Sequence, residues 1–145
     1  MGNGSSAATS SHFACDFNKG LSYQKDKKFK VICLNDNIPA MLAWANDDGY
    51  EDIFAEQLKN FLNKDDIVIA LSASGNSKNI IKAVKYANEK GAITVGLSGF
   101  CSGELKKIAK HNICANINNI QISEDIHFII CHLVYSVLEK VSEKQ

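Results

Sequence analysis

A turn rich in hydroxyl groups follows an apolar run in the middle of the chain. The run DIVIALS (66–72) predicts a buried strand, and Ser72, Ser74 and Ser77 surround Gly75 before a helical pattern begins. A helix N-terminus offers free N–H groups and a partial positive charge, and glycine lets the backbone approach a ligand closely. These residues could hold a phosphate, although a plain N-cap with turn serines would give the same pattern. Because the lysine of a P-loop is missing, a sugar phosphate is favoured over a nucleoside triphosphate.

A second turn rich in glycine and serine, GNGSSAATSSH (2–12), leads into another helical pattern. Turns that leave the carboxyl ends of parallel strands lie where such sheets bind ligands, at the switch point between strands. Two of them could converge on one ligand there. Taken alone, the sequence GNG is also typical of an ordinary turn.

Two polar side chains of this first helical pattern, His12 and Asp16, are four residues apart. The spacing places them on one helix face, with about 5–6 Å between their Cβ atoms. They could form half of a metal site or an acid–base pair. An exposed polar pair without a function would have the same spacing.

The last helical pattern, SEDIHFIICHLVYSVLEK (123–140), carries His127 and His132. Five positions correspond to about 140° around a helix, so at most one of the two faces a common site. Glu124 lies within about 80° of His132 but about 12 Å from it along the axis. One metal bound by both would need a bend, a long reach or a ligand from another subunit. A histidine in such an apolar helix is also commonly a satisfied core residue.

Four short apolar runs predict strands. The first three are of the nearly continuous kind found in parallel sheets covered on both faces, and the fourth is weaker. They are residues 29–34, 66–72, 92–98 and 112–117. Helical patterns are found at residues 37–46, 50–64, 76–91, 103–110 and 123–140. The alternation predicts a doubly wound α/β sheet with right-handed crossovers. No strand precedes the first glycine-rich turn, so we expect a single domain over residues 1–145 that is N-terminally truncated and lacks its first strand.

The composition is that of an ordinary globular protein, with 145 residues of which 46% are hydrophobic and 22% charged. A formal net charge of zero argues against a nucleic-acid or acidic membrane partner. No apolar segment reaches the roughly 18 residues of a membrane span, and nothing at the N-terminus has the pattern of a signal peptide. Cys33, Cys114 and Cys131 lie within apolar runs, and we expect them to be buried thiols in a reducing cytoplasm.

Taken together, the motifs resemble those of one family. GNGSSAATSSHF, NDDGYEDIFAEQL, SASGNSKNIIKAVKYANEKG and the paired histidines of the last helix occur in the same order as in phosphoheptose isomerases. These SIS (sugar isomerase) domain proteins convert sedoheptulose 7-phosphate to D-glycero-D-manno-heptose 7-phosphate, which feeds lipopolysaccharide or capsule synthesis. The resemblance covers residues 2–140. It implies a three-layer, flavodoxin-like α/β domain that acts in the cytoplasm, commonly as a homotetramer with sites between subunits.

The resemblance also implies roles for individual residues. The serines that hold the phosphate correspond to Ser6, Ser72, Ser74 and Ser77. The other positions that line the substrate correspond to Asn3, Gly4, Ser5, Asn46, Asp47, Ala73 and Glu124. A metal ion, usually zinc, is held at positions that correspond to His12, Asp16, Glu124 and His132. Acid–base catalysis falls to the positions of Asp16 and His132.

Four positions near the implied metal and sugar differ from the family pattern. The family usually has Glu where this chain has Asp16, and Gln where it has Glu124. Asp is usual at the positions of Thr9 and Gln121. The base would therefore be one methylene shorter, and the metal site would carry additional negative charge.

Two further departures lie in the loops. Ala73 replaces a hydroxyl residue, and Ser5 replaces a glycine whose positive φ would be strained by a side chain. With the phosphate loop intact and the catalytic set altered, a second hypothesis is a non-catalytic SIS protein. It would be a sugar-phosphate sensor or a scaffold that binds the replication initiator DnaA. A third hypothesis is an isomerase of a different phosphosugar.

Overall fold

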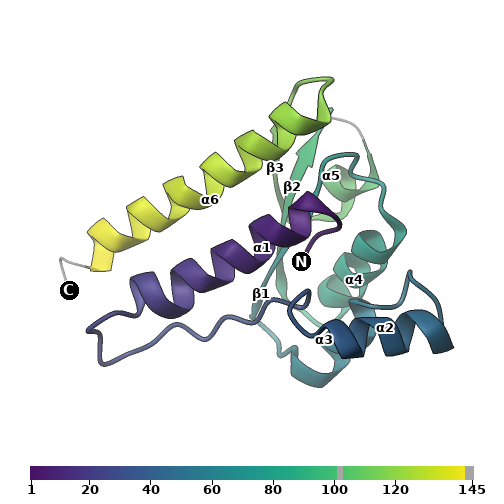
Figure 1. Ribbon diagram of the computed structural model, residues 1–145, viewed down its shortest axis with the longest axis horizontal. Coiled ribbons are helices and arrows are strands. Elements are labelled where there is room, and N and C mark those ends of the chain that lie inside the picture. Colours follow the sequence, from purple (N-terminus) through teal and green to yellow (C-terminus); the bar gives the residue numbers. More distant parts are fainter. Residues whose placement is uncertain (101–102, 143–145) are drawn as a thin grey trace.

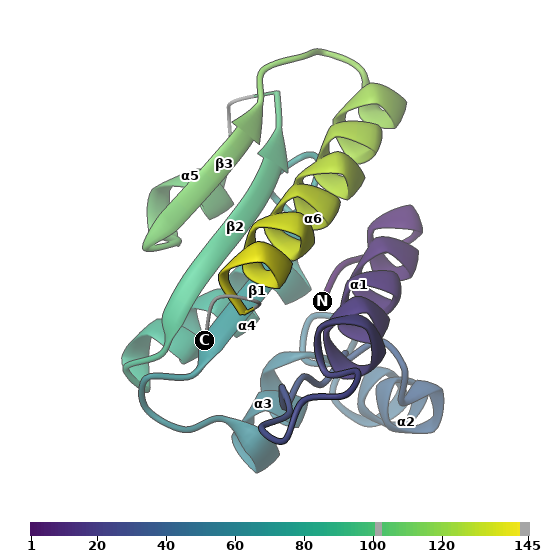
Figure 2. The same cartoon turned by 90° about the vertical axis from the view of Figure 1, so that its left-hand side faces the viewer.

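The structure is a computed structural model that describes residues 1–100 and 103–142. Three parallel strands form its sheet in the order β1–β2–β3. Helices α1 and α6 cover one face of this sheet, and α4 and α5 cover the other (Figures 1 and 2). The expected α/β architecture, a parallel sheet between two helical layers, is therefore confirmed.

Most elements agree with the sequence patterns. The strands are β1 (Ile67–Ser72), β2 (Ile93–Gly99) and β3 (His111–Ala115). The helices are α1 (Ser5–Cys15), α2 (Ile38–Asp47), α3 (Ala55–Phe61), α4 (Lys78–Glu89), α5 (Glu104–Ile108) and α6 (Ile120–Ser142). A π-helical turn, η1 (Asp16–Leu21), continues α1.

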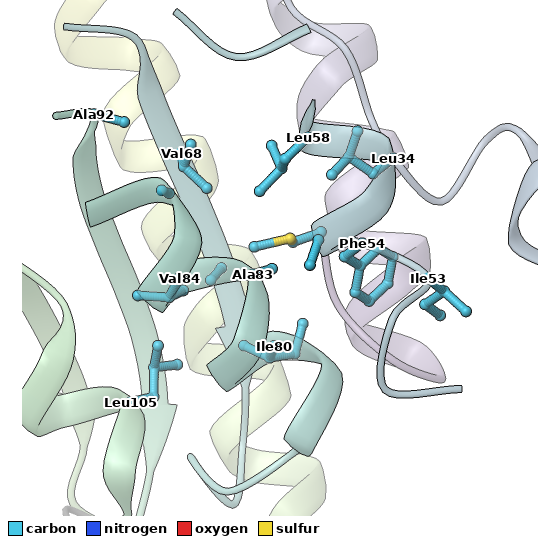
Figure 3. Close-up of a cluster of buried hydrophobic side chains, with 14 residues drawn as sticks. Leu34, Ile53, Phe54, Leu58, Val68, Ile80, Ala83, Val84, Ala92 and Leu105 are labelled. Carbon is cyan, nitrogen blue, oxygen red and sulfur yellow. The ribbon is translucent and has the colours of Figure 1, made fainter. Parts of the chain in front are cut away.

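Helix α4 supplies much of the core on its side of the sheet. Ile80, Ala83, Val84 and Ala87 follow one another at intervals of three, one and three residues and are all fully buried, as a helix with one apolar face requires. They pack with residues of β1 and of the region around α3, including Phe54 (Figure 3). The start of α4, which follows the serine-rich turn, is thus held in place by the buried face of the helix.

Residues 29–34 form no strand, so the prediction of a strand there is wrong. An apolar run becomes a strand where a neighbouring strand satisfies its backbone N–H and C=O groups. Here Met1 lies along the outer edge of β1 and exchanges two backbone hydrogen bonds with it, of 3.0 and 2.9 Å. The extended segment is held instead by the side chain of Asn18, which bonds both the N–H and the C=O of Val31.

The cysteines follow the sequence expectation in part. Cys33 and Cys131 are buried free thiols, as expected. Cys114 is half-buried and disulfide-bonded, so the prediction of a buried thiol is wrong at that position. Over residues 1–100 and 103–142, the helices lack the combination of length and hydropathy that crossing a bilayer requires.

Candidate active site

The serine loop, residues 72–77, leaves the carboxyl end of β1 and opens α4. The hydroxyl oxygens of Ser72 and Ser77 lie 3.2 Å apart, and the Gly75 N–H donates to the Ser72 hydroxyl at 3.2 Å. Ser77 is the N-cap residue of α4, yet its side chain makes no capping hydrogen bond to the described first turn. The N-cap part of the alternative is therefore not supported. Ser72 and Ser74 do act as turn serines, because they accept hydrogen bonds from the N–H groups of Gly75 and Asn76.

Residues 103–105 support this loop from the neighbouring segment. Two of their backbone N–H groups donate to the loop, to the carbonyl of Gly75 at 2.9 Å and to the side-chain oxygen of Asn76 at 3.0 Å. Gly103 has a φ of 98°, and a Cβ atom there would lie 2.6 Å from the Ser74 carbonyl oxygen. Glycine is needed at this point because any side chain would push the two segments apart.

The glycine loop, residues 2–6, opens α1 and lies beside the serine loop. Gly4 has a φ of 55°, whereas Ser5 is already the first helical residue. The strain expected at Ser5 is therefore absent, and that prediction is wrong, because the positive φ falls on the preceding glycine. The side-chain amide of Asn3 exchanges two hydrogen bonds with that of Asn79, of 2.9 and 2.8 Å. The glycine loop is thus bonded to the first turn of α4, which directly follows the serine loop.

His12, Asp16 and His132 form what we call the histidine–aspartate cluster, on the facing sides of α1 and α6. The Nε2 atoms of His12 and His132 lie 3.0 Å apart. Asp16 Oδ2 lies 3.4 Å from the first of these nitrogens and 3.8 Å from the second. One ligand atom from each residue falls within 4.8 Å of the others. The sequence placed His12 and Asp16 on one helix face, and the structure adds the histidine from the other end of the chain.

The donor set of this cluster fits a divalent metal ion. Asp16 Oδ2 is buried and has no hydrogen-bond partner among the described residues, although such an acceptor is costly to leave unsatisfied. Zinc bound by histidine nitrogen and carboxylate oxygen at about 2.0–2.2 Å in a tetrahedron has ligand atoms about 3.3–3.5 Å apart. The three observed separations span this value. Three protein ligands with one open position are typical of catalytic zinc.

The remaining predicted site residues are placed as follows. Ser6 is buried near the start of α1, and the carbonyl of Ala73 accepts from an N–H of β2 at 2.8 Å. Asn46 and Asp47 are exposed at the end of α2, where Asn46 Nδ2 donates to Asp47 Oδ1 at 2.8 Å. Glu124 lies outside the cluster that the described residues form, about 12 Å along α6 from its histidine.

One of the two histidines of α6 faces the cluster, as the helical spacing predicts. His132 is exposed beside Asp16, whereas His127 is 1% exposed. Neither ring nitrogen of His127 has a hydrogen-bond partner among the described residues. Burial lowers its pKa, and this outweighs the opposing influence of the Ser98 backbone and the Glu124 carboxylate. His127 is therefore a neutral core residue at pH 7.

The thiol beside the cluster stays protonated. Burial raises the pKa of Cys131 to about 11, and the negative charge of Asp16 contributes to the rise. A thiolate is the form of cysteine that attacks an electrophile or binds a metal. Cys131 therefore adds no nucleophile at neutral pH, and it lies outside the cluster of possible metal ligands that the described residues form.

Sequence reasoning missed three residues of this region. The ring of Phe128 packs against both imidazoles, with centroids 4.8 Å from His12 and 4.5 Å from His132. Its position four residues before His132 was the available signal. Asn79 and Tyr50 bond the glycine loop through Asn3, and no spacing rule connects segments so far apart in the chain.

Comparisons with known proteins agree with this fold. The family model of the SIS domain matches residues 1–99. A phosphoheptose isomerase structure from Francisella tularensis superposes with a TM-score of 0.91 at 26% identity, covering 97% of this chain and 74% of that one. The chain therefore has the fold and the sequence features of the SIS-domain class.

The curated relatives narrow the class further. A phosphoheptose isomerase of Helicobacter pylori strain P12 is 32% identical over 139 residues, which cover 96% of this chain and 72% of the relative. A probable phosphoheptose isomerase of Thermoplasma volcanium is 33% identical, and the match covers 96% of this chain and 70% of that protein. The chain belongs to the phosphoheptose isomerase family.

The buried histidine generates a prediction about the pH dependence of stability. Burial keeps His127 neutral in the folded chain, whereas the unfolded chain takes up a proton there below the ordinary histidine pKa of about 6.5. The free energy of unfolding should therefore fall as the pH drops from 6.5 to 5, with His127 adding at most about 1.4 kcal/mol per pH unit. His127→Gln should reduce this slope in urea unfolding experiments.

The exposed His111, replaced by glutamine in the same way, is the matched control. Both variants and the wild type are measured at several pH values between 5 and 7. A slope that is reduced equally in both variants, or in neither, would contradict the role given to burial.

Proposed function

We propose that this chain is an aldose–ketose isomerase that converts sedoheptulose 7-phosphate to D-glycero-D-manno-heptose 7-phosphate. The observation that carries the proposal is the histidine–aspartate cluster, in which Asp16 and His132 lie 3.8 Å apart although 116 positions separate them in the sequence. The isomerisation moves a proton between adjacent carbons through an enediol. It requires a base over the carbon and an acid near the oxygen, each contributing roughly 10²–10⁴-fold.

The chain supplies both groups. The Asp16 carboxylate, with one oxygen free of hydrogen bonds among the described residues, is suited to accept the carbon-bound proton. The exposed His132 imidazole beside it is suited to hold or deliver a proton at the carbonyl oxygen. Phe128 packs against this ring and limits its rotation. The proposed acid and base thus have fixed positions on two packed helices.

The serine loop and the glycine loop bind the other end of the substrate in this proposal. Serine hydroxyls and the N–H groups at the start of α4 suit a phosphate dianion. Along α1, His12 is eight residues beyond Gly4, or about 12 Å. A substrate that reaches from the loops to the cluster is therefore a long phosphosugar, and binding of its phosphate orients the reacting carbons.

A steady-state assay of sedoheptulose 7-phosphate conversion tests the activity. Wild-type protein should turn the substrate over, and Asp16→Asn should lower kcat by about 10²–10⁴-fold because the base is lost. Asp26→Asn, which changes an exposed carboxylate in a distant turn, should have wild-type activity. Zero turnover by the wild type, with sugar-phosphate binding retained, would reject the enzyme and favour a non-catalytic SIS protein.

We also propose that His12, Asp16 and His132 hold a zinc ion. When bound there, the ion would act as a Lewis acid toward the carbonyl oxygen of the substrate, in place of a proton from His132, and the second Asp16 oxygen would remain as the base. The Asp16 oxygen, which has no hydrogen-bond partner among the described residues, and the facing imidazole nitrogens support this assignment. Glu124, the fourth residue implied by the resemblance, would have to come from another copy of the chain, because the helix holds it about 12 Å from its own His132.

Metal analysis tests this assignment without reference to activity. Protein dialysed against zinc should retain about one ion per chain, and His12→Ala should retain far less, because it removes one of three ligands. His111→Ala removes an exposed histidine on β3 and should bind zinc as the wild type does. Equal zinc contents in the two variants would contradict the assignment.

We further propose that the chain forms a homo-oligomer, a tetramer by the resemblance. Four aliphatic residues repeat every four positions on one face of α6 and are 50–60% exposed, namely Ile129, Leu133, Val137 and Val141. Such a contiguous apolar stripe suits an interface between helices. Contact along this stripe would also bring a second copy close to the histidine–aspartate cluster.

Light scattering after gel filtration measures the oligomeric state. The wild type should elute as an oligomer, and Val137→Glu should shift it toward the monomer, because a charge would be buried in the interface. Leu42→Glu changes a similarly exposed residue on α2 and should keep the wild-type state. A monomeric wild type would contradict the proposal.

A further inference from the structure

A pair of side-chain amides joins the glycine loop to the first turn of α4. Asn3 Nδ2 donates to Asn79 Oδ1 at 2.9 Å, and Asn79 Nδ2 donates to Asn3 Oδ1 at 2.8 Å. Asn79 is 2% exposed and lies two residues after Ser77, whose hydroxyl faces that of Ser72. The amide pair thus links the glycine loop to the helical turn that directly follows the serine loop.

A third residue, Tyr50, completes this link. Its hydroxyl donates to Asn3 Oδ1 at 2.9 Å. Tyr50 lies in the turn after α2, so three segments far apart in the sequence meet at the Asn3 amide.

The backbone fixes the orientation of these amides. The Ile80 N–H donates to Asn79 Oδ1 at 2.9 Å, and because an N–H can only donate, the oxygen of Asn79 must be on that side. The Asn79 NH₂ group then faces Asn3 Oδ1, which also accepts from Tyr50. Each of the two amide oxygens accepts two hydrogen bonds, which is its full capacity.

This arrangement changes the role expected for Asn3. The resemblance implies a position that lines the substrate, but the Asn3 oxygen is fully occupied by protein donors. Among the described residues, one N–H group of the amide is left without a partner. The contacts therefore make Asn3 first a structural connection between loops.

We propose that Asn79 and Tyr50 are positioning residues for the isomerase reaction, which hold the glycine loop at a fixed distance from the serine loop through Asn3. This inference rests on the proposed function. A long phosphosugar held by its phosphate in the serine loop can present its reacting carbons correctly only if the glycine loop does not move relative to that phosphate. A misplacement of about 1 Å can cost about 10²-fold in rate.

The decisive variant is Tyr50→Phe, which removes a single hydroxyl from an exposed side chain. Tyr50 is 60% exposed and Tyr23 is 61% exposed, so Tyr23→Phe is a closely matched control that leaves the loops untouched. Asn79→Ala is the stronger variant, because it removes both bonds to Asn3. Thermal unfolding of each full-length variant is recorded alongside.

Two quantities are compared for each variant. The first is kcat and KM for sedoheptulose 7-phosphate, and the second is the affinity for inorganic phosphate measured by calorimetry. Tyr50→Phe should lower kcat/KM by about 3- to 10-fold, the effect of one hydrogen bond, and Asn79→Ala by about 10- to 100-fold. Phosphate affinity should stay within about 2-fold of the wild type, because the three serines are unchanged.

The outcomes separate this inference from the proposed function. If the wild type shows no turnover, the isomerase proposal fails. The positioning role of Asn79 and Tyr50 is then tested by binding alone, as the ratio of the affinities for sedoheptulose 7-phosphate and inorganic phosphate. A ratio that falls in Tyr50→Phe and Asn79→Ala but not in Tyr23→Phe supports it. Unchanged kcat/KM together with an unchanged affinity ratio overturns it. A loss of phosphate affinity as large as the loss of sedoheptulose 7-phosphate affinity also overturns it. If Asn79→Ala does not fold, Tyr50→Phe decides.

Discussion

Parallel pairing of β1 with β2 is the constraint on which the binding region depends. Both strands end at one edge of the sheet, where Ser72 lies opposite Ser98. The serine loop and the segment after β2 therefore emerge side by side. Met1, bonded along β1, brings the glycine loop to the same edge. Positive φ values at Gly4 and Gly103 then allow the sharp turns and the close approach that let three segments share this small region.

The histidine–aspartate cluster is difficult to explain as a contribution to stability. Asp16 Oδ2 is buried without a hydrogen-bond partner among the described residues, which costs about 1–3 kcal/mol relative to a satisfied acceptor. The two facing imidazole nitrogens can share at most one proton between them as a hydrogen bond. A cation between the three groups would satisfy all of them at once. The arrangement is therefore better understood as a site prepared for a ligand than as a packing solution.

The sequence predicted those elements whose signal is local. The run 66–72 and the helical period of 76–91 were sufficient, because a buried strand and an amphipathic helix each have a characteristic repeat. Residues 29–34 have the same apolar character but lack a paired neighbour, which a local pattern cannot reveal. The spacing of His12 and its aspartate predicted half of the cluster. The approach of His132 depends on how α6 packs against α1, and it was anticipated from the resemblance and not from any spacing.

The shorter carboxylate at Asp16 is one of the substitutions that raised the non-catalytic hypothesis, and the geometry weakens this argument. Asp16 Oδ2 lies 3.4 Å from His12 Nε2 and 3.8 Å from His132 Nε2, so the missing methylene does not take the carboxylate out of the cluster. The helix changes from α to π at this residue, and π-helical turns are frequent at functional sites. Thr9, another substituted position, is buried and donates to the Ser5 carbonyl within α1. The substituted Asp16 thus keeps its place in the cluster, and Thr9 is satisfied within its own helix. The three donor groups stay together, which favours an isomerase over a scaffold.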